Sequence, residues 1–279
     1  MMEVYYINHK NQKIDLGKSP YQMEVGDIFD FSYKYEGNNN KITRIYKDIT
    51  TLSTNVTIDS KTEEEFYHFA NLFFEIIDAD NIANQRGKLY IGEYYVECNV
   101  ISSNKTFWKE TFRGMENAVK ILIPYPYWCS ESTKTFLKGN IKNKGNETDP
   151  YLYYPFGYPY QYSALQDERF IQNDHYAACD FKMLIFGPCT NPAIMINGHL
   201  HEVRASIHDG ERLEIDSRNH TVHRHMNDGR IENLFNLRNK ESNLFEKIPN
   251  GRCNVLWNIE AFGFDLTLYK ERSEPKWIL

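Results

Sequence analysis

The sequence predicts a mainly β protein with one α-helix in its N-terminal domain, and three observations support this fold class. Tyr and Phe are abundant, with 20 and 17 copies among 279 residues, and both residue types favour half-buried strands and protein interfaces. Short segments of alternating apolar and polar residues are separated by turn dipeptides. Only one segment, which follows Ser60, has apolar residues at helical spacing.

The N-terminal residues are expected to form short strands separated by turns. One segment alternates Phe29, Phe31 and Tyr33 on a single predicted face, which favours a strand. Gly and Asn residues at 37–40 indicate a turn, and β-branched residues are frequent beyond it. The expected strands of this region are 2–7, 13–16, 28–35 and 51–58.

A single helix is predicted next. Ser60 and Glu63 have the spacing of a capping box, in which the serine oxygen accepts a hydrogen bond from the Glu63 amide while the Glu63 side chain reaches back. A wide apolar stripe with helical period follows, and mostly polar residues end the helix before Gly87. We interpret the stripe as core and not as a cofactor site. Its members are Phe66, Phe69, Ala70, Phe73, Phe74, Ile76 and Ile77.

A hairpin is predicted around Gly92-Glu93, because glycine at the first central position of a two-residue loop favours a type II′ turn. Its strands are 88–91 and 94–97, and a short apolar strand over 118–123 follows later. From Pro124 the composition changes. We therefore predict an N-terminal domain over 1–128 and a C-terminal domain over 129–279, with the boundary inside 124–165.

The segment 151–162 is rich in tyrosine and is interrupted by two prolines and a glycine. Such a segment cannot hold a regular helix, and proline restricts its pairing as a central strand. Two interpretations stay open: an extended arm that crosses between domains, or a surface loop with packed aromatic side chains.

The C-terminal third is predicted to be a small antiparallel β-domain that assembles or binds something. Asn197-Gly198 is the preferred dipeptide of a type I′ hairpin, and Asp209-Gly210, Asp228-Gly229 and Asn250-Gly251 mark further turns. Apolar residues alternate from Cys253 to Ile259 and again after Gly263. Short strands with this spacing indicate a sandwich or a barrel.

Composition argues against several classes of protein. The net charge is −6 with no run of Lys and Arg, so sequence-independent nucleic-acid binding is not expected. No apolar stretch approaches the about 18 residues of a membrane helix, and the N-terminus does not have the pattern of a signal peptide. Five widely spaced cysteines without CxxC predict free thiols in a reducing compartment. We expect the protein to be made in a cytoplasm and to stay there until something releases it.

Five histidines lie near one another in the sequence, and imidazoles suit Zn or Cu. A turn at Arg218-Asn219 would place Ile215 opposite Val222 and would put His223 and His225 on one face, with His220 on the other. We therefore expect a solvated histidine face and no metal site. The five histidines are His199, His201, His220, His223 and His225.

Catalytic motifs are not evident either. The sequence has no GxSxG, HExxH, P-loop or GxGxxG, and Cys129 has no assignable base. We predict no catalytic, metal or cofactor-binding residue, no cofactor and no enzymatic activity.

Two stretches carry a resemblance to a known family. The first runs from Asn197-Gly198 through Asp209-Gly210-Glu211 and Ile215-Asp216-Ser217-Arg218 to Val222. The second begins at Asn233 and runs through Lys247-Ile248-Pro249-Asn250-Gly251 and Phe262–Tyr269, closing near Trp277. Both resemble the C-terminal domain of siphophage distal tail (Dit) proteins, also called phage tail component proteins. The order of N-terminal strands, aromatic helix and long hairpin is similar too.

The resemblance implies a structural role in a phage or prophage virion, at the tail tip or baseplate hub. Six copies of the N-terminal domain would close into a ring, with back-to-back rings a further option, and a galectin-like sandwich would project outward. The ring would join the tail tube protein to a tail-tip protein, either a tail-associated lysin or a receptor-binding protein. The chain would be made in the bacterial host cytoplasm and would let DNA pass through its lumen without specific binding.

Cyclic assembly needs heterologous interfaces, which aromatic hairpins can supply. We predict the subunit interface at the Gly92-Glu93 hairpin, through Tyr90, Ile91, Tyr94 and Tyr95. The alternative function is a β-sandwich that binds host cell-wall polysaccharide through exposed Tyr or Trp. Trp257 alternates in phase with Val255 and Ile259 and is expected in the core, so it is a poor candidate for stacking on sugars. A hydrolase is the third and least favoured hypothesis.

Overall fold

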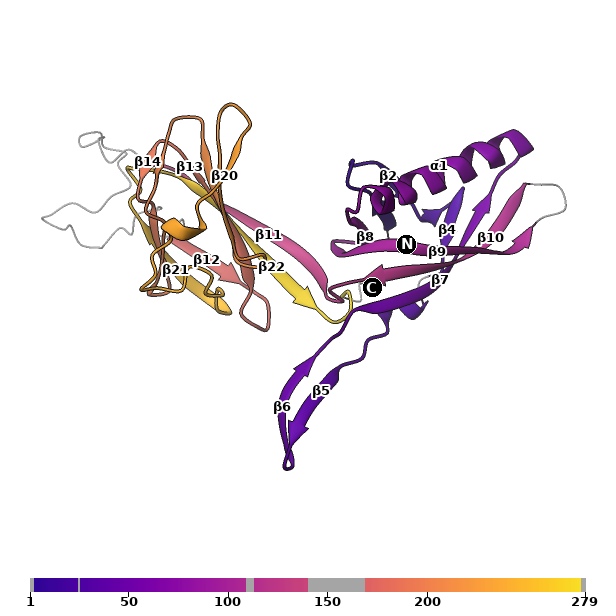
Figure 1. Cartoon of the computed structure of the whole chain (residues 1–279), viewed down its shortest axis with the longest axis horizontal. Coiled ribbons are helices and arrows are strands. Elements are labelled where there is room, and N and C mark those ends of the chain that lie inside the picture. The colour runs from indigo at the N-terminus through magenta and orange to yellow at the C-terminus, as the bar shows by residue number, and fades with distance from the viewer. Residues whose placement is uncertain (1–2, 25, 109–112, 140–168, 277–279) are drawn as a thin grey trace, which may run out of the picture. The chain divides into compact units, whose positions relative to one another are not determined.

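A computed structural model describes residues 3–24, 26–108, 113–139 and 169–276 (Figure 1). The chain divides into two compact units. Unit 1 comprises residues 1–130 and 271–279, and unit 2 comprises residues 131–270. Each unit is built around its own cluster of buried apolar side chains. The predicted fold class of a mainly β protein with one helix near its N-terminus is confirmed.

Unit 1 contains helix α1, a short 3₁₀ helix and most of the long strands. Its elements are β1 (Val4–Ile7), β2 (Lys13–Asp15), β3 (Gly17–Lys18), β4 (Tyr21–Met23), η1 (Gly26–Phe29), β5 (Lys34–Asn38), β6 (Lys41–Tyr46), β7 (Thr50–Asp59), α1 (Glu63–Ile82), β8 (Gly87–Ile91), β9 (Tyr94–Trp108) and β10 (Gly114–Ile123). Two strands, β11 (Trp128–Phe136) and β22 (Phe264–Arg272), have residues in both units.

Unit 2 is made of strands and contains the short 3₁₀ helix η3. Its remaining elements are β12 (Phe170–Asn173), β13 (Asp180–Phe186), β14 (Cys189–Thr190), β15 (Ala193–Ile196), β16 (His199–Glu202), β17 (Ser206–Ile207), β18 (Arg212–Asp216), β19 (Thr221–His225), β20 (Ile231–Asn233), η3 (Phe235–Leu237) and β21 (Gly251–Trp257).

Strand β9 pairs with different strands of unit 1 along its length. Its residues 94–98 pair with β8, which pairs in turn with β1 and then β2. Its residues 99–108 pair with β10, which pairs with β7. All of these pairs are antiparallel. The predicted apolar strand over 118–123 is the second half of β10, and the predicted turn between β1 and β2 is confirmed.

The predicted strand over 28–35 is wrong. Residues 26–29 form η1, regular pairing starts only at Lys34, and the residues between have no strand structure. The three aromatic residues predicted to share one face differ in burial. Phe29 is buried at 9% exposure, whereas Phe31 and Tyr33 are 50% and 45% exposed. Alternation of aromatic residues therefore arose here without a common buried face.

Helix α1 is confirmed, but its cap lies two residues later than predicted. Thr62 is the N-cap, with an extended backbone, and its hydroxyl accepts the amide of Glu65. The Glu65 carboxylate accepts the amide of Lys61 in return. Ser60 does not cap the helix: its hydroxyl contacts the carbonyls of Thr62 and Arg113 instead and joins the end of β7 to the start of β10.

Replacing Thr62 with alanine should lower the free energy of unfolding of unit 1 by about 1 kcal/mol, because the Glu65 amide loses its acceptor at the helix start. Thr62→Ser is the matched control, since it keeps the hydroxyl. Urea denaturation of both variants measures the difference. An alanine variant as stable as the serine variant would contradict the cap.

Unit 2 contains two main antiparallel sheets. One has the strand order β20-β19-β18-β13-β22 and the other β12-β21-β15-β16. Side chains from both sheets, among them Phe181 and Ile194, belong to one buried cluster. The predicted hairpin at Asn197-Gly198 is confirmed, with φ angles of 50° and 85° at its two central residues. These positive values match the type I′ turn that the dipeptide favours.

All five cysteines are buried, and none forms a disulfide bond. No helix in the described ranges has the length and apolar character needed to span a membrane. The tyrosine-rich segment 151–162 lies outside the described residues.

Candidate functional site

The hairpin predicted as the subunit interface exists and joins β8 to β9, with Gly92 at φ 58°. Its four predicted interface residues lie on opposite faces of the sheet. Ile91 and Tyr94 are cross-strand partners that point into the core of unit 1, where they are 2% and 6% exposed. Tyr90 and Tyr95, also partners, occupy the other face.

Tyr90 and Tyr95 belong to a ladder of three tyrosines that crosses adjacent strands. The Tyr5 and Tyr90 rings stack with centroids 4.6 Å apart and planes within 10°. The Tyr90 and Tyr95 centroids are 5.4 Å apart. The ammonium groups of Lys13 and Lys88 lie over Tyr5 and Tyr95, at 3.8 and 4.2 Å from the ring centroids. Such cross-strand aromatic pairs and cation–π contacts stabilise the sheet itself.

Contacts within one chain already bury much of the aromatic surface of these predicted interface residues. Tyr95 is 5% exposed, and only Tyr90 of the four predicted residues is half-buried. An aspartate in place of Tyr94 would enter the core and impair folding, so it cannot test assembly. The interface at these four residues stays a prediction.

A second feature, which the sequence did not reveal, is a free-standing hairpin that we call the arm (residues 34–46). Its strands β5 and β6 form a two-stranded sheet that pairs with no other described strand. Asn39 and Asn40 reverse the chain with φ angles of 49° and 62°. Figure 1 shows the arm extending away from the rest of unit 1.

The arm is amphipathic although both of its faces are exposed. Tyr35 pairs with Ile45 and Gly37 with Ile42, and a register shift between Glu36 and Gly37 leaves Ile42 on the same face as Tyr35 and Ile45. These three side chains are 74%, 60% and 65% exposed. The opposite face carries Glu36 paired with Arg44. An unpartnered apolar face of this kind is typical of a surface that packs against another molecule.

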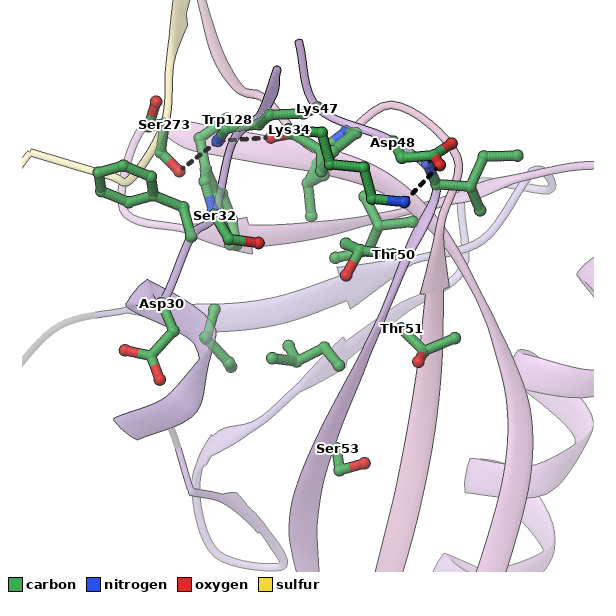
Figure 2. A pocket seen from close by; sticks show the side chains of 17 residues that line it. Asp30, Ser32, Lys34, Lys47, Asp48, Thr50, Thr51, Ser53, Trp128 and Ser273 are labelled. Carbon is green, nitrogen blue, oxygen red and sulfur yellow. Dashed lines mark hydrogen bonds and ion pairs between the residues drawn. The ribbon is translucent and has the colours of Figure 1, made fainter. Parts of the chain in front are cut away.

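The root of the arm borders a pocket of about 430 Å³ in unit 1. Figure 2 shows polar side chains around it, where the Lys34 ammonium pairs with the Asp48 carboxylate at 2.8 Å. Apolar side chains, including Leu52 and Ile123, and the buried Trp128 also line the pocket.

Lys47 follows the arm and contacts several chain segments. Its ammonium donates to the carbonyls of Pro126 at 3.0 Å and Ser273 at 3.4 Å (Figure 2). Three aromatic rings surround it: Phe31, Tyr33 and Tyr127 have centroids 5.0, 5.2 and 4.8 Å away. Burial lowers the pKa of Lys47 to about 8, and the nearby Glu274 carboxylate partly opposes that shift.

The histidines lie as the predicted register requires. Ile215 pairs with Val222 and Glu214 with His223, so His223 and His225 share one face. The turn, however, spans 217–220 and not two residues, and His220 lies in it with φ 52°. Among the described residues, no three His, Cys, Asp or Glu side chains are grouped closely enough to hold a metal ion.

Trp257 packs against the core of unit 2, as its alternation predicted. Its ring makes edge contacts with Phe136 and Phe264, both with centroids 5.4 Å away. Its indole N–H donates to the Phe262 carbonyl at 3.0 Å. Because Trp257 is partly buried, its ring contacts two phenylalanines and its polar atom is satisfied, it is a poor candidate for stacking on a sugar.

No protein-family model matches this chain, and no curated protein matches its sequence. Solved structures match it over nearly the whole length. A chain of the phage P2 baseplate in its activated conformation with Ca aligns with a TM-score of 0.60 and 11% identity, covering 99% of this chain and 100% of that chain. The same baseplate with Sr gives 0.58 and 12%, with 99% and 100% covered.

The Dit protein (gp 19.1) of phage SPP1, described as a paradigm of hub adsorption apparatus in phages that infect Gram-positive bacteria, aligns with a TM-score of 0.56 and 8% identity. The alignment covers 98% of this chain and 99% of that chain. The Dit-like fold of phage tail hub proteins is therefore shared by this chain, as the sequence resemblance predicted.

Proposed function

We propose that this protein is a structural component of a phage or prophage tail tip, where it forms a ring that joins the tail tube to the host-adsorption apparatus. The observation that carries the proposal is the shared fold, which covers 98% of this chain and 99% of SPP1 Dit and so extends to both units. The role is one of assembly and not of catalysis.

The arm supports self-assembly. Its apolar face exposes Tyr35, Ile42 and Ile45 in the single chain, and a two-stranded hairpin alone is only marginally stable in water. Packing this face on a neighbouring copy would bury it. The arm and a different surface of the next copy would form a heterologous contact, which closes into a ring when the rotation allows. We propose a hexamer, singly or as back-to-back rings.

Size-exclusion chromatography with light scattering, together with negative-stain microscopy, tests this proposal. The wild-type chain should form rings, and Ile45→Asp should abolish them, because a carboxylate on the buried face of a contact is strongly unfavourable. The matched control is Lys41→Asp, which changes an exposed side chain on the other face of the same hairpin. This variant should still assemble.

Two results would count against the ring. A wild-type chain that stays monomeric at high concentration would contradict self-assembly. Rings formed equally well by Ile45→Asp would show that the arm is not the contact surface. They would favour the interface predicted at the Gly92-Glu93 hairpin, which includes Tyr90.

We further propose that unit 1 forms the ring and that unit 2 is a galectin-like sandwich that projects outward. The partners would be the tail tube protein on one side and a tail-tip lysin or receptor-binding protein on the other, with DNA passing through the lumen. Binding of the full chain to host cell-wall polysaccharide would support the alternative role of unit 2. The packed Trp257 does not favour it.

A further inference from the structure

The direction of the arm is fixed only at its root. Strands β5 and β6 pair with each other and with no other described strand, and every residue of β5 is exposed. A hairpin without neighbours cannot determine its own orientation relative to the body that carries it. The residues that flank it, Tyr33 before β5 and Lys47 after β6, are therefore the ones that can.

Both flanking residues contact one short segment, which we call the strap (residues 271–276). The Tyr33 hydroxyl lies 2.6 Å from the Ser273 hydroxyl. The Lys47 ammonium donates to the Ser273 carbonyl and also to the Pro126 carbonyl. The strap is held in turn, because the Tyr125 hydroxyl donates to the Glu271 carboxylate at 2.7 Å and Pro275 is buried.

The contacts around Lys47 suit a donor with a positive charge. One ammonium links two chain segments that are far apart in the sequence, and the centroids of three aromatic rings lie 4.8–5.2 Å from it, with Lys47 itself half-buried. Hydrogen bonds from a charged donor and cation–π contacts both gain strength when water is excluded. Lys34, by contrast, pairs with Asp48 at the surface, where both side chains are more than half exposed.

We propose that Lys47 is the positioning residue of the arm: its caged ammonium and Tyr33 fasten the root of the hairpin to the strap and so set the direction in which the arm projects. The strap continues directly from β22, whose first residues belong to unit 2. Its consequence for assembly rests on the proposed function. An arm with a fixed direction already has, before association, the orientation that contact with a neighbouring copy requires. Preorganisation of this kind reduces the entropic cost of association.

Pulsed electron–electron double resonance on the full chain tests the proposal. Spin labels on Asn38→Cys in the arm and Lys120→Cys on β10 report the arm direction, since both positions are exposed and all five native cysteines are buried. The measurement uses the Ile45→Asp background, in which the chain is expected to be monomeric. Wild-type Lys47 should give one narrow distance distribution.

Lys47→Met keeps the length of the side chain but removes the charge and the donors, and we expect the narrow distribution to be lost. Lys47→Arg should restore it, because a guanidinium also donates and stacks on rings. Tyr33→Phe, which removes only the hydrogen bond to Ser273, should broaden it partly. Lys34→Met is the matched control and should leave it narrow. Circular dichroism should show that unit 1 remains folded in each of these variants.

A Lys47→Met chain with an unchanged narrow distribution would overturn the proposal, as would equal broadening by Lys34→Met. A broad distribution in the Lys47 chain itself would also overturn it. These results are separate from the ring test. A narrow distribution in a protein that forms no rings would refute the proposed function and leave the positioning role of Lys47 intact.

Discussion

Replacing Asp80 with alanine is expected to lower the free energy of unfolding of unit 1 by about 3–5 kcal/mol. Asp80 is fully buried at 0% exposure, near the end of α1. One carboxylate oxygen accepts the Tyr6 hydroxyl, and the other lies 2.8 Å from the His9 amide and 2.5 Å from the His9 Nδ1. Alanine would leave the buried Tyr6 hydroxyl and the partly buried His9 groups without their acceptor, and an unsatisfied buried donor is costly.

The surroundings are shaped for this carboxylate. Burial is the main cause that raises the pKa of Tyr6, so the phenol stays protonated and donates to Asp80. Gly87 leaves the necessary room, since a Cβ there would lie 2.4 Å from the Asp80 carboxylate. Asp78→Ala is the matched control, because Asp78 is an exposed acid on the same helix. Urea denaturation measures both, and similar losses in the two variants would contradict a special role for Asp80.

Local sequence patterns predicted much of the fold where a backbone conformation depends on a few neighbouring residues. Asn197-Gly198 and Gly92-Glu93 adopt the positive φ angles that their residue types favour, so both hairpins could be placed from the sequence. The helix stripe was likewise sufficient to locate α1. The cap was misplaced because two capping-box spacings overlap here, Ser60 with Glu63 and Thr62 with Glu65, and the local pattern does not show that the Ser60 hydroxyl bonds to Arg113.

The candidate site was harder to predict for two different reasons. The first is periodicity: neighbouring residues of a strand point to opposite faces, so a set that includes both Tyr94 and Tyr95 cannot face one partner. The second is sequence distance. Ile42 and Ile45 are three residues apart, and they share a face only because of a register shift that the sequence does not show. The surroundings of Lys47 depend on Ser273, which is 226 residues away.

Acidification is expected to destabilise unit 2 through His201. This side chain is 2% exposed, its ring packs edge-on against Phe181, and its Nδ1 lies 2.8 Å from the Leu244 carbonyl. Burial lowers its pKa to about 4, and the Leu244 carbonyl only partly opposes this effect. The unfolded chain, with a histidine pKa of about 6.5, takes up a proton first.

Stability should therefore be lost as the pH falls from about 6.5 to about 4, by about 3 kcal/mol in total, because the folded state must either exclude the proton or bury a charge. Other acid-sensitive groups contribute as well, so the informative quantity is the difference from His201→Asn, whose amide can donate to Leu244 but does not titrate. The free energy of unfolding of unit 2 should be measured by urea denaturation between pH 4 and 7, with amide exchange assigning the change to unit 2. It should depend less on pH in this variant than in the wild type.

His208→Asn should leave the wild-type profile unchanged, since His208 is exposed on the same unit. Parallel profiles for His201→Asn and the wild type would mean that the buried imidazole does not govern the acid sensitivity. A steeper loss in the wild type confined to the window between the two pKa values would instead tie it to His201. The proximity of the five histidines in the sequence suggested a solvated face. The histidine expected to affect stability most, however, is His201, which is buried.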